Sequence, residues 1–356
     1  MAKALVLLSG GLDSMLAARI LMEQGIEVTG LSFKSYFFGT AKAKKVAEQL
    51  GMKLIEIDFS VEHLAMVKNP KHGYGKNMNP CIDCHALMLK KAKEIMVNPP
   101  CPPCQGGEQF NFVATGEVLG ERPMSQNAKA LKTVEKESGL TGRLIRPLSA
   151  KLLPESDSEK AGLVSRGKLL DLSGRSRKRQ LALVKKYGIK EFASPGGGCL
   201  LTDPVFSEKL MKLFEYWPDG DGLDIQLLKY GRLFWLKDRE EKDVLLIVGR
   251  DQEDNEQLEK LVRPGDVLIK FAPLVAGPTS LIRSKKLEVR IKNEMQEIEA
   301  PEELKMSELK LGESKSQEEI INIASLLTGY YAAKARGKKV KLEINIIPEL
   351  TRLKNI

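Results

Sequence analysis

Two glycines directly follow the first apolar run of the chain, and this arrangement constrains the fold more than any other sequence feature. Ala4–Leu8 has the composition of a buried strand, and Ser9-Gly10-Gly11-Leu12-Asp13-Ser14 follows it at once. Apolar residues at helical spacing then begin within Asp13–Gln24. Glycines allow close approach of an anion, and the start of a helix offers unpaired N–H groups. The sequence therefore predicts a phosphate-binding turn between a first strand and a first helix.

Strands and helices continue to alternate through the amino-terminal half of the chain. The predicted strands are Ala4–Leu8, Ile26–Phe33, Lys53–Phe59 and Phe110–Thr115, and the predicted helices are Asp13–Gln24, Gly39–Leu50 and Ala86–Met96. This order is typical of an α/β fold in which helices cover both faces of a parallel sheet. Such sheets bind ligands beyond the carboxyl ends of their strands.

After Pro204 the pattern changes to short strands separated by Gly and Pro. A chain of 356 residues is long enough for two domains, and we predict them at residues 1–204 and 205–356. The second and smaller domain is expected to be α+β. Its predicted helices are Phe206–Phe214 and Glu318–Lys334, and its predicted strands are Arg232–Leu236, Val244–Val248, Asp266–Phe271 and Val340–Ile346.

The charge balance indicates a polyanionic partner. Lys and Arg number 56 against 47 Asp and Glu, a net charge of +9, which favours nucleic acid. The densest basic run contains Arg175, Arg177, Lys178 and Arg179, for which we predict contacts to RNA phosphates. A solvated helix face is the alternative interpretation. The stretch Ala333–Lys341 is a second basic patch with the same two interpretations.

The cysteines are too few for a disulfide framework. No apolar run approaches the ~18 residues of a membrane span, so we expect a soluble, cytoplasmic protein whose five thiols serve chemistry or metal binding. Cys81/Cys84 and Cys101/Cys104 have zinc-site spacing, but the helix predicted between them would separate the pairs by roughly 16 Å. Zinc is therefore disfavoured, and Cys101 and Cys104 receive no role.

The three histidines do not predict a catalytic triad. They are His63, His72 and His85. His85 adjoins Cys84 and would lower the pKa of that thiol if the two side chains met. A histidine at the start of a helix without any function is the equal alternative.

The run Ser9–Ser14 resembles the SGGxDS motif of the PP-loop ATP pyrophosphatases. The resemblance implies a Rossmann-like (adenine nucleotide alpha hydrolase-like) fold and cleavage of ATP to AMP and pyrophosphate with adenylation of a substrate oxygen. It also implies ATP and Mg²⁺ as cofactors, with the adenine near the end of the second strand. The nucleotide-binding residues so implied are Ser9, Gly10, Gly11, Leu12, Asp13, Ser14, Ser32 and Phe33.

Asn79–Cys84 resembles the NPxxxC segment of the bacterial tRNA 2-thiouridylases, which are PP-loop proteins related to the 4-thiouridine synthases. Cys84 stands at the position of their catalytic cysteine, and Cys199 stands where they carry a second, sulfur-bearing cysteine. Ala114-Thr115-Gly116 is similar to their ATGH segment, with Glu117 in place of the histidine. The resemblance implies that Thr115 and Gly116 contact the nucleotide.

Cys81 is an additional thiol relative to the 2-thiouridylases. Together Cys81, Cys84 and Cys199 resemble the three ligands of PP-loop thiolases that hold a [4Fe–4S] cluster. The alternative is that the same residues are catalytic thiols of a persulfide relay, in which one carries sulfur and another resolves the disulfide. Both alternatives remain open at the level of sequence, beside an inert buried role.

Resemblance to the thiouridylases covers roughly residues 1–204. Beyond them, Val248–Asp251, Pro264–Asp266 and Gly277–Thr279 are similar to the small RNA-binding domain at the end of ribosome-quality-control proteins. The combined expectation is an ATP-dependent tRNA uridine sulfurtransferase. Its partners would be tRNA and a sulfur donor, either sulfide or a persulfide-carrying protein, without a membrane. A nitrogen-transferring PP-loop ligase and a non-catalytic RNA-binding nucleotide sensor are the alternatives.

Overall fold

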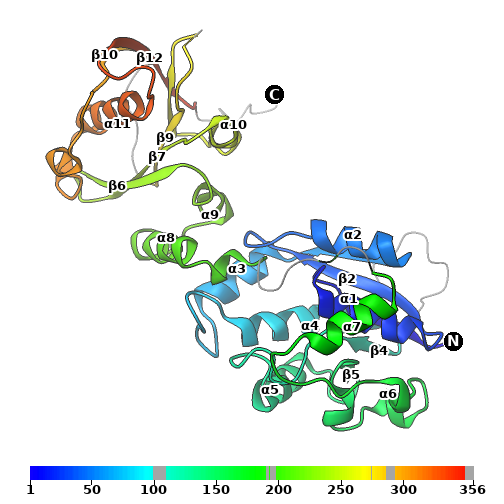
Figure 1. Cartoon of the computed structure of the whole chain (residues 1–356). Helices are drawn as coiled ribbons and strands as arrows, with labels where there is room; N and C mark the ends of the chain where they lie inside the picture. The colour runs from blue at the N-terminus through cyan, green and yellow to red at the C-terminus, as the bar shows by residue number, and fades with distance from the viewer. Residues whose placement is uncertain (99–109, 190–191, 193–197, 274, 286–292, 349–356) are drawn as a thin grey trace, which may run out of the picture. The chain divides into compact units, whose positions relative to one another are not determined.

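The computed structural model describes residues 1–98, 110–189, 192, 198–273, 275–285 and 293–348 (Figure 1). The chain divides into two compact units, Met1–Ser207 and Glu208–Ile356. The division falls within helix α8 (Pro204–Tyr216). Among the described residues, no helix combines the length and the apolar character needed to cross a membrane.

The amino-terminal unit is built on a five-stranded sheet in the order β3-β2-β1-β4-β5, with every neighbouring pair parallel. Its strands are β1 (Lys3–Leu7), β2 (Glu27–Lys34), β3 (Lys53–Asp58), β4 (Phe112–Ala114) and β5 (Leu144–Ile145). This arrangement confirms the predicted α/β fold with a Rossmann-like parallel sheet.

Helices of the amino-terminal unit bury apolar residues on both faces of the sheet. They are α1 (Leu12–Met22), α2 (Ala41–Leu50), α3 (Ser60–Lys68), α4 (Cys81–Val97), α5 (Ala128–Ser138), α6 (Asp157–Lys160) and α7 (Lys178–Lys186). Alternate residues of β1 enter different cores, since Val6 packs with the residues of α1 and Leu5 with those of α4. This alternation is the strand periodicity of two side chains per repeat.

The predicted helix Ala86–Met96 is longer in the structure, because α4 already begins at Cys81. Helices α3 and α5 were not predicted. Each is started by a neighbouring side chain: the Asp58 carboxylate accepts from the Ser60 N–H, and the Asn127 side chain accepts from the Ala130 N–H.

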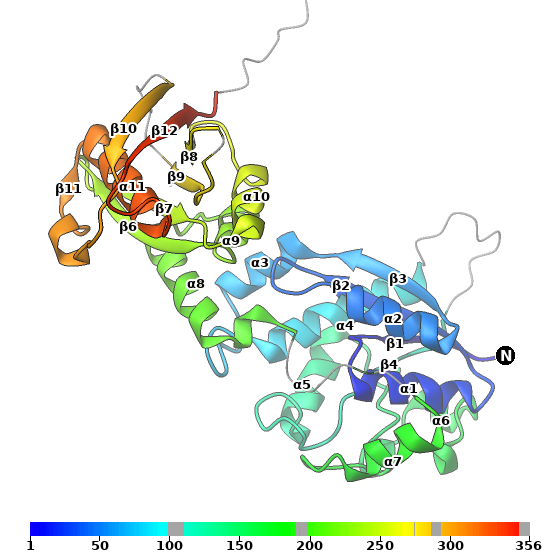
Figure 2. The ribbon, with the colours of Figure 1, turned by 45° about the horizontal axis from the view of Figure 1, so that its top comes forward.

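A seven-stranded mixed sheet forms the carboxy-terminal unit, in the order β10-β12-β8-β9-β7-β6-β11. Its strands are β6 (Arg232–Asp238), β7 (Asp243–Val248), β8 (Val267–Phe271), β9 (Ser280–Ser284), β10 (Glu294–Glu299), β11 (Ser314–Lys315) and β12 (Lys339–Ile346). Helix α11 (Gln317–Tyr331) lies against this sheet (Figure 2) and buries Ile320, Ala324 and Leu327 in its core. With α9 (Gly222–Leu227) and α10 (Gln252–Lys260), these elements confirm the predicted α+β class.

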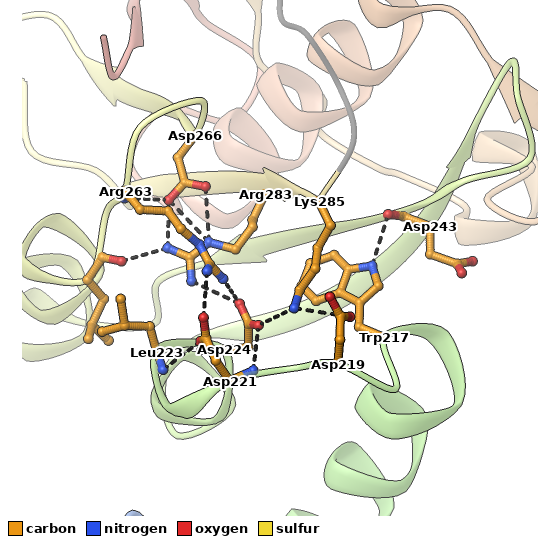
Figure 3. A network of polar contacts seen from close by, with 11 residues as sticks. Trp217, Asp219, Asp221, Leu223, Asp224, Asp243, Arg263, Asp266, Arg283 and Lys285 are labelled. Carbon is orange, nitrogen blue, oxygen red and sulfur yellow. Dashed lines mark hydrogen bonds and ion pairs between the residues drawn. The ribbon is translucent and has the colours of Figure 1, made fainter. Parts of the chain in front are cut away.

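A buried ionic network joins the start of α9 to the sheet of the same unit (Figure 3). Asp224 is fully buried, and its carboxylate lies 3.2 Å from Arg283 Nη1 and 3.2 Å from Lys285 Nζ. Arg283 also meets Asp266 at 2.6 Å. Arg263 completes the network by contacting Asp224. Because a buried charge is tolerated only when it is paired, each member depends on the others.

We expect Asp224→Ala to lower the free energy of unfolding of this unit by about 3–5 kcal/mol, since it removes the buried carboxylate that Arg263, Arg283 and Lys285 share. Asp219→Ala is the matched control, because Asp219 also pairs with Lys285 but its side chain is 78% exposed. Its loss should cost less than about 1 kcal/mol. The two tryptophans of the chain, Trp217 and Trp235, lie in this unit and report urea unfolding by their fluorescence. Equal losses for both variants would contradict this account.

Candidate functional site

The predicted phosphate-binding turn connects β1 to α1. Gly10 has φ of +79°, a conformation that favours glycine, and Gly11 is the extended residue before the helix. The Ser14 hydroxyl donates to the Gly11 carbonyl at 2.9 Å, and the Gly11 N–H donates to Ser9 Oγ at 3.3 Å. A Cβ on Gly10 would lie 2.5 Å from the Lys42 backbone. The turn is therefore fixed by its own side chains and by the start of α2.

The end of β4 lies directly against this turn. A Cβ on Gly116 would lie 2.4 Å from the Ser14 nitrogen and 2.5 Å from the Asp13 carbonyl carbon. The neighbouring Thr115 is buried and donates its hydroxyl to Glu117 at 2.9 Å. Gly116 thus lies at the predicted nucleotide site, whereas the hydroxyl of Thr115 is used inside the protein.

Three other residues of the predicted nucleotide site contribute buried side chains. Leu12 belongs to the core on the α1 face, and the ring of Phe33 packs 5.0 Å from that of Phe59. Ser32 is also buried, near the carboxyl end of β2. Because these side chains are buried, a nucleotide at the predicted site would meet the backbone of these positions and the surface of the strand end.

Asp13, in the first turn of α1, is paired with a residue far along the chain. Its Oδ2 lies 3.0 Å from Arg177 Nη2, which also meets Glu121 at 3.1 Å. Its Oδ1 is buried and has no hydrogen-bond partner among the described residues. Burial, together with the charge of Glu121, raises the pKa of Asp13 to about 6. An unpartnered carboxylate oxygen at a helix start is a ligand that suits Mg²⁺.

Two of the four cations in the basic run around α7 form ion pairs within the protein, which leaves two for contacts to RNA. Arg177 is half-buried and engaged with the turn, and Arg179 lies 2.5 Å from Asp171 on the surface. Arg175 and Lys178 are exposed and have no carboxylate partner within the described part of the chain. Phosphate contacts by this run remain a prediction, which Arg175 and Lys178 suit best.

The predicted thiol group comes together at the start of α4. Cys81 and Cys84 occupy the first turn of this helix, and Cys199 precedes a short 3-10 helix whose Leu200 N–H donates to the Phe37 carbonyl at 3.1 Å. Burial raises the pKa of Cys84 well above its usual value, and the nearby thiols of Cys199 and Cys81 raise it further. Burial also raises the pKa of Cys199 to about 11. Cys101 and Cys104 lie outside the described residues.

The position of Cys84 at a helix start does not by itself make the thiol reactive. Although Cys84 lies in the first turn of a helix, removal of its thiol from water outweighs the helix dipole and keeps the proton on sulfur. Deprotonation then requires a partner close to the sulfur.

His63, for which the sequence predicted no catalytic partner, supplies this contact. Its Nε2 lies 3.3 Å from Cys84 Sγ, and its Nδ1 lies 2.7 Å from Ser35 Oγ. The ring is fully buried and stacks on Phe59 at 4.8 Å, and this burial lowers the pKa of His63 to about 4. The sequence predicted no triad of histidines, and the structure brings His63 into contact with Ser35 and Cys84 because β2, α3 and α4 pack together.

His85 binds Glu117 and is not among the groups that shift the pKa of Cys84, which corrects the suggested influence on that thiol. Its Nδ1 lies 2.9 Å from Glu117 Oε1, and the other oxygen of Glu117 accepts from Arg146 Nε at 2.9 Å. Although burial opposes it, Arg146 and His85 hold the pKa of Glu117 far below its usual value. Glu117 therefore binds the first turn of α4 to the end of β4.

A single zinc ion does not fit the three thiols. Their sulfurs would have to lie within about 4 Å of one another, and among the described residues only His72, Asp83 and Glu137 bring three ligand atoms within 4.8 Å. Both ring nitrogens of His72 are already occupied, at 3.1 Å from Asp83 and 3.2 Å from Glu137. An iron–sulfur cluster spreads its thiolates over several metal ions, so the three-cysteine donor set is compatible with that cofactor.

Comparisons with known proteins agree with these features. Residues 1–150 match the family model ThiI, described as thiamine biosynthesis protein (ThiI). The chain is 37% identical over 131 residues to the tRNA-specific 2-thiouridylase MnmA of Sulfurimonas denitrificans, which covers 33% of this chain and 35% of that protein. It is 28% identical over 176 residues to MnmA of Mannheimia succiniciproducens, covering 44% and 43%. The chain thus matches less than half the length of these relatives.

Among solved structures, similarity extends to a 4-thiouridine synthetase in complex with RNA and bound ATP. The identity is 20% and the TM-score 0.37, over 64% of this chain and 52% of that chain. A predicted subunit of tRNA methyltransferase from Methanocaldococcus jannaschii is 17% identical with a TM-score of 0.33, over 52% and 76%.

Gly116→Ala tests the close approach of β4 to the turn. The added Cβ meets backbone rather than a flexible side chain, so we expect a loss of about 1–3 kcal/mol in the stability of the amino-terminal unit. Gly39→Ala is the control, because a Cβ there meets no atom within 4 Å. Urea unfolding followed by circular dichroism measures both. A fully stable Gly116→Ala variant would show that the strand end and the turn are not in tight contact.

Proposed function

We propose that this chain is an ATP-dependent tRNA uridine sulfurtransferase, because residues 1–150 match the ThiI family model and the same region is similar to tRNA-specific 2-thiouridylases. One observation carries the proposal. Gly116 packs on the PP-loop turn, and the adjacent Glu117 binds His85, the neighbour of Cys84. Two consecutive residues therefore connect the phosphate-binding turn with the thiols at one edge of the sheet.

In the first step, the turn binds ATP and the uridine carbonyl oxygen attacks the α-phosphate. The N–H groups at the start of α1 and the hydroxyls of Ser9 and Ser14 bind the departing pyrophosphate. Asp13 would hold Mg²⁺, which neutralises phosphate charge when it is bound. The products are an adenylated uridine and pyrophosphate. Adenylation is needed because AMP is a far better leaving group than a bare carbonyl oxygen.

In the second step, Cys199 carries a persulfide supplied by the sulfur donor. Its terminal sulfur attacks the activated carbon of uridine and expels AMP, which leaves the base joined to Cys199 through a disulfide. Cys84 gives its proton to His63 and attacks Cys199 Sγ, which breaks the sulfur–sulfur bond and frees the thiouridine. A Cys84–Cys199 disulfide remains, and an external dithiol reduces it. The contact between Cys84 Sγ and His63 Nε2 supports this thiol chemistry.

The cofactor alternative uses the same residues. Cys81, Cys84 and Cys199 would hold a [4Fe–4S] cluster, which would supply an iron site for the incoming sulfide. Cys81 distinguishes the persulfide relay from the cluster, because the relay needs only Cys84 and Cys199.

The test supplies the full chain with unmodified tRNA, ATP, Mg²⁺ and sulfide or a persulfide donor, and measures thiouridine by nucleoside mass spectrometry. We expect thiouridine and pyrophosphate with the wild-type protein, and no thiouridine with Cys84→Ala or Cys199→Ala. An active Cys84→Ala enzyme would favour the nitrogen-transferring ligase. Absence of pyrophosphate release with any RNA would favour the nucleotide sensor.

Cys81→Ser separates the relay from the cluster. The relay predicts that this variant retains thiolation, whereas the cluster predicts its loss together with iron–sulfur absorbance after anaerobic reconstitution with iron and sulfide.

His63→Phe tests the proton acceptor at Cys84. Phenylalanine fits the aromatic surroundings of Phe37, Phe38 and Phe59 but accepts no proton. We expect alkylation of Cys84 by iodoacetamide to slow by roughly tenfold or more, measured by peptide mass spectrometry. Alkylation of Cys199 in the same sample is the internal control and should not change. Equal rates at Cys84 in both proteins would remove His63 from the mechanism.

A further inference from the structure

Five of the six arginines described in the carboxy-terminal unit fall into two groups, and Arg239 belongs to neither. Arg250, Arg263 and Arg283 each face a carboxylate: the distances are 2.6 Å to Asp254, 2.9 Å to Asp221 and 2.6 Å to Asp266. Arg232 and Arg336 have no carboxylate within 4.0 Å in the described part of the unit, and their guanidinium groups lie over tyrosine rings instead. The first three arginines form ion pairs within the unit. No described carboxylate neutralises the charge of Arg232 or Arg336.

The two unpaired arginines belong to one continuous stack. Arg232 Cζ lies 4.3 Å from the ring centre of Tyr331, and Arg336 Cζ lies 4.6 Å from that of Tyr330. The two tyrosine rings are 5.1 Å apart and meet edge to face. We name Arg232, Tyr331, Tyr330 and Arg336 the arginine–tyrosine ladder. None of its members is buried, and Arg336 is exposed.

The fold holds this ladder in place before any ligand arrives. Tyr330 and Tyr331 end α11, whose opposite side is fixed in the core, and Arg232 begins β6. Arg336 Nε donates to the Tyr330 carbonyl at 2.8 Å, which orients the guanidinium over the ring. Capping the helix uses only this nitrogen, so the Nη groups of Arg336 remain available as a planar fork.

Two further cations lie beside the ladder. Lys334 and Lys338 are exposed, and neither has a carboxylate within 4.0 Å among the described residues. The Lys338 ammonium donates to the Lys334 carbonyl at 3.0 Å. The surface therefore combines positive charge with aromatic faces, which is the combination that binds unpaired nucleotides through phosphate contacts and base stacking.

We propose that the arginine–tyrosine ladder binds unpaired RNA nucleotides, with the guanidinium groups on phosphates and the bases stacked on the exposed planes. This inference rests on the proposed function for the identity of the RNA, a tRNA. It assigns to the carboxy-terminal unit the task of holding the substrate while the amino-terminal unit carries out the chemistry. A planar stacked guanidinium recognises both parts of a nucleotide, whereas a purely anionic partner requires the charge alone.

The test measures binding of the full chain to fluorescein-labelled polyuridine by fluorescence anisotropy at several salt concentrations. We expect the double variant Arg232→Gln/Arg336→Gln to bind roughly tenfold more weakly, with a salt slope smaller by about 1.4, as the loss of two single-strand phosphate contacts predicts. Arg239→Gln is the matched control, because Arg239 is also exposed and lacks a carboxylate within 4.0 Å but lies outside the ladder. It should bind like the wild-type protein.

Arg336→Lys separates stacking from charge. It keeps the cation and should keep the salt slope, while the loss of the planar group weakens binding several-fold. Tryptophan fluorescence and the alkylation rate of Cys84 verify that both units remain folded in every variant. Wild-type affinity of the double variant, or an equal loss in Arg239→Gln, would overturn the proposal.

Ladder-dependent binding to anionic phosphatidylglycerol vesicles without polyuridine binding would also overturn it. Ladder-dependent polyuridine binding by a protein that produces no thiouridine supports the ladder and rejects the proposed function alone.

Discussion

The arrangement of the amino-terminal unit depends on the contact between two backbone segments. The turn after β1 and the end of β4 approach so closely that Gly116 has no room for a Cβ, and Gly10 of the same turn has none against the start of α2. The β1–β4 pairing ends at Val6 and Ala114, so sheet pairing alone does not set the distance between the turn and Gly116. The close approach brings Glu117 to the edge of the sheet where the helix of the thiols begins. Through Glu117 and His85, the position of α4 is tied to the phosphate-binding turn.

The thiol of Cys84 is kept protonated and is not an exposed thiolate. A cysteine in water is partly ionised near neutral pH, and a charged neighbour would increase that fraction. Here burial holds the proton on Cys84 and equally holds His63 neutral. A neutral pair in contact can exchange its proton when a sulfur electrophile arrives, without an exposed thiolate that oxidants would attack. In the proposed mechanism, the aromatic rings around His63 would serve the chemistry by excluding water.

Several features followed from the sequence with little ambiguity. The strand–glycine–helix order at residues 4–24 predicted the turn, and the alternation up to Thr115 predicted the parallel sheet. The proximity of Cys84 and Cys199 was an expectation of family resemblance alone, and the effect of Cys199 on the pKa of Cys84 agrees with it. Helix α3 was missed because it is short and its apolar residues do not form one clear helical stripe, and with it His63 was missed. The role of Arg177 was also unexpected: a residue assigned to RNA holds Asp13 across 164 positions of sequence.

The sequence by itself determined the local elements, since strand and helix periodicity, glycine turns and caps act over a few neighbouring residues. It thereby determined that a glycine turn stands between a strand and a helix and that two thiols lie close together before a predicted helix. Only the tertiary structure decided which side chains meet them. Ser35, His63 and Cys84 come from three separate elements, as do Glu117, His85 and Arg146. No local sequence pattern predicts these side-chain contacts, because they depend on how helices pack across a twisted sheet.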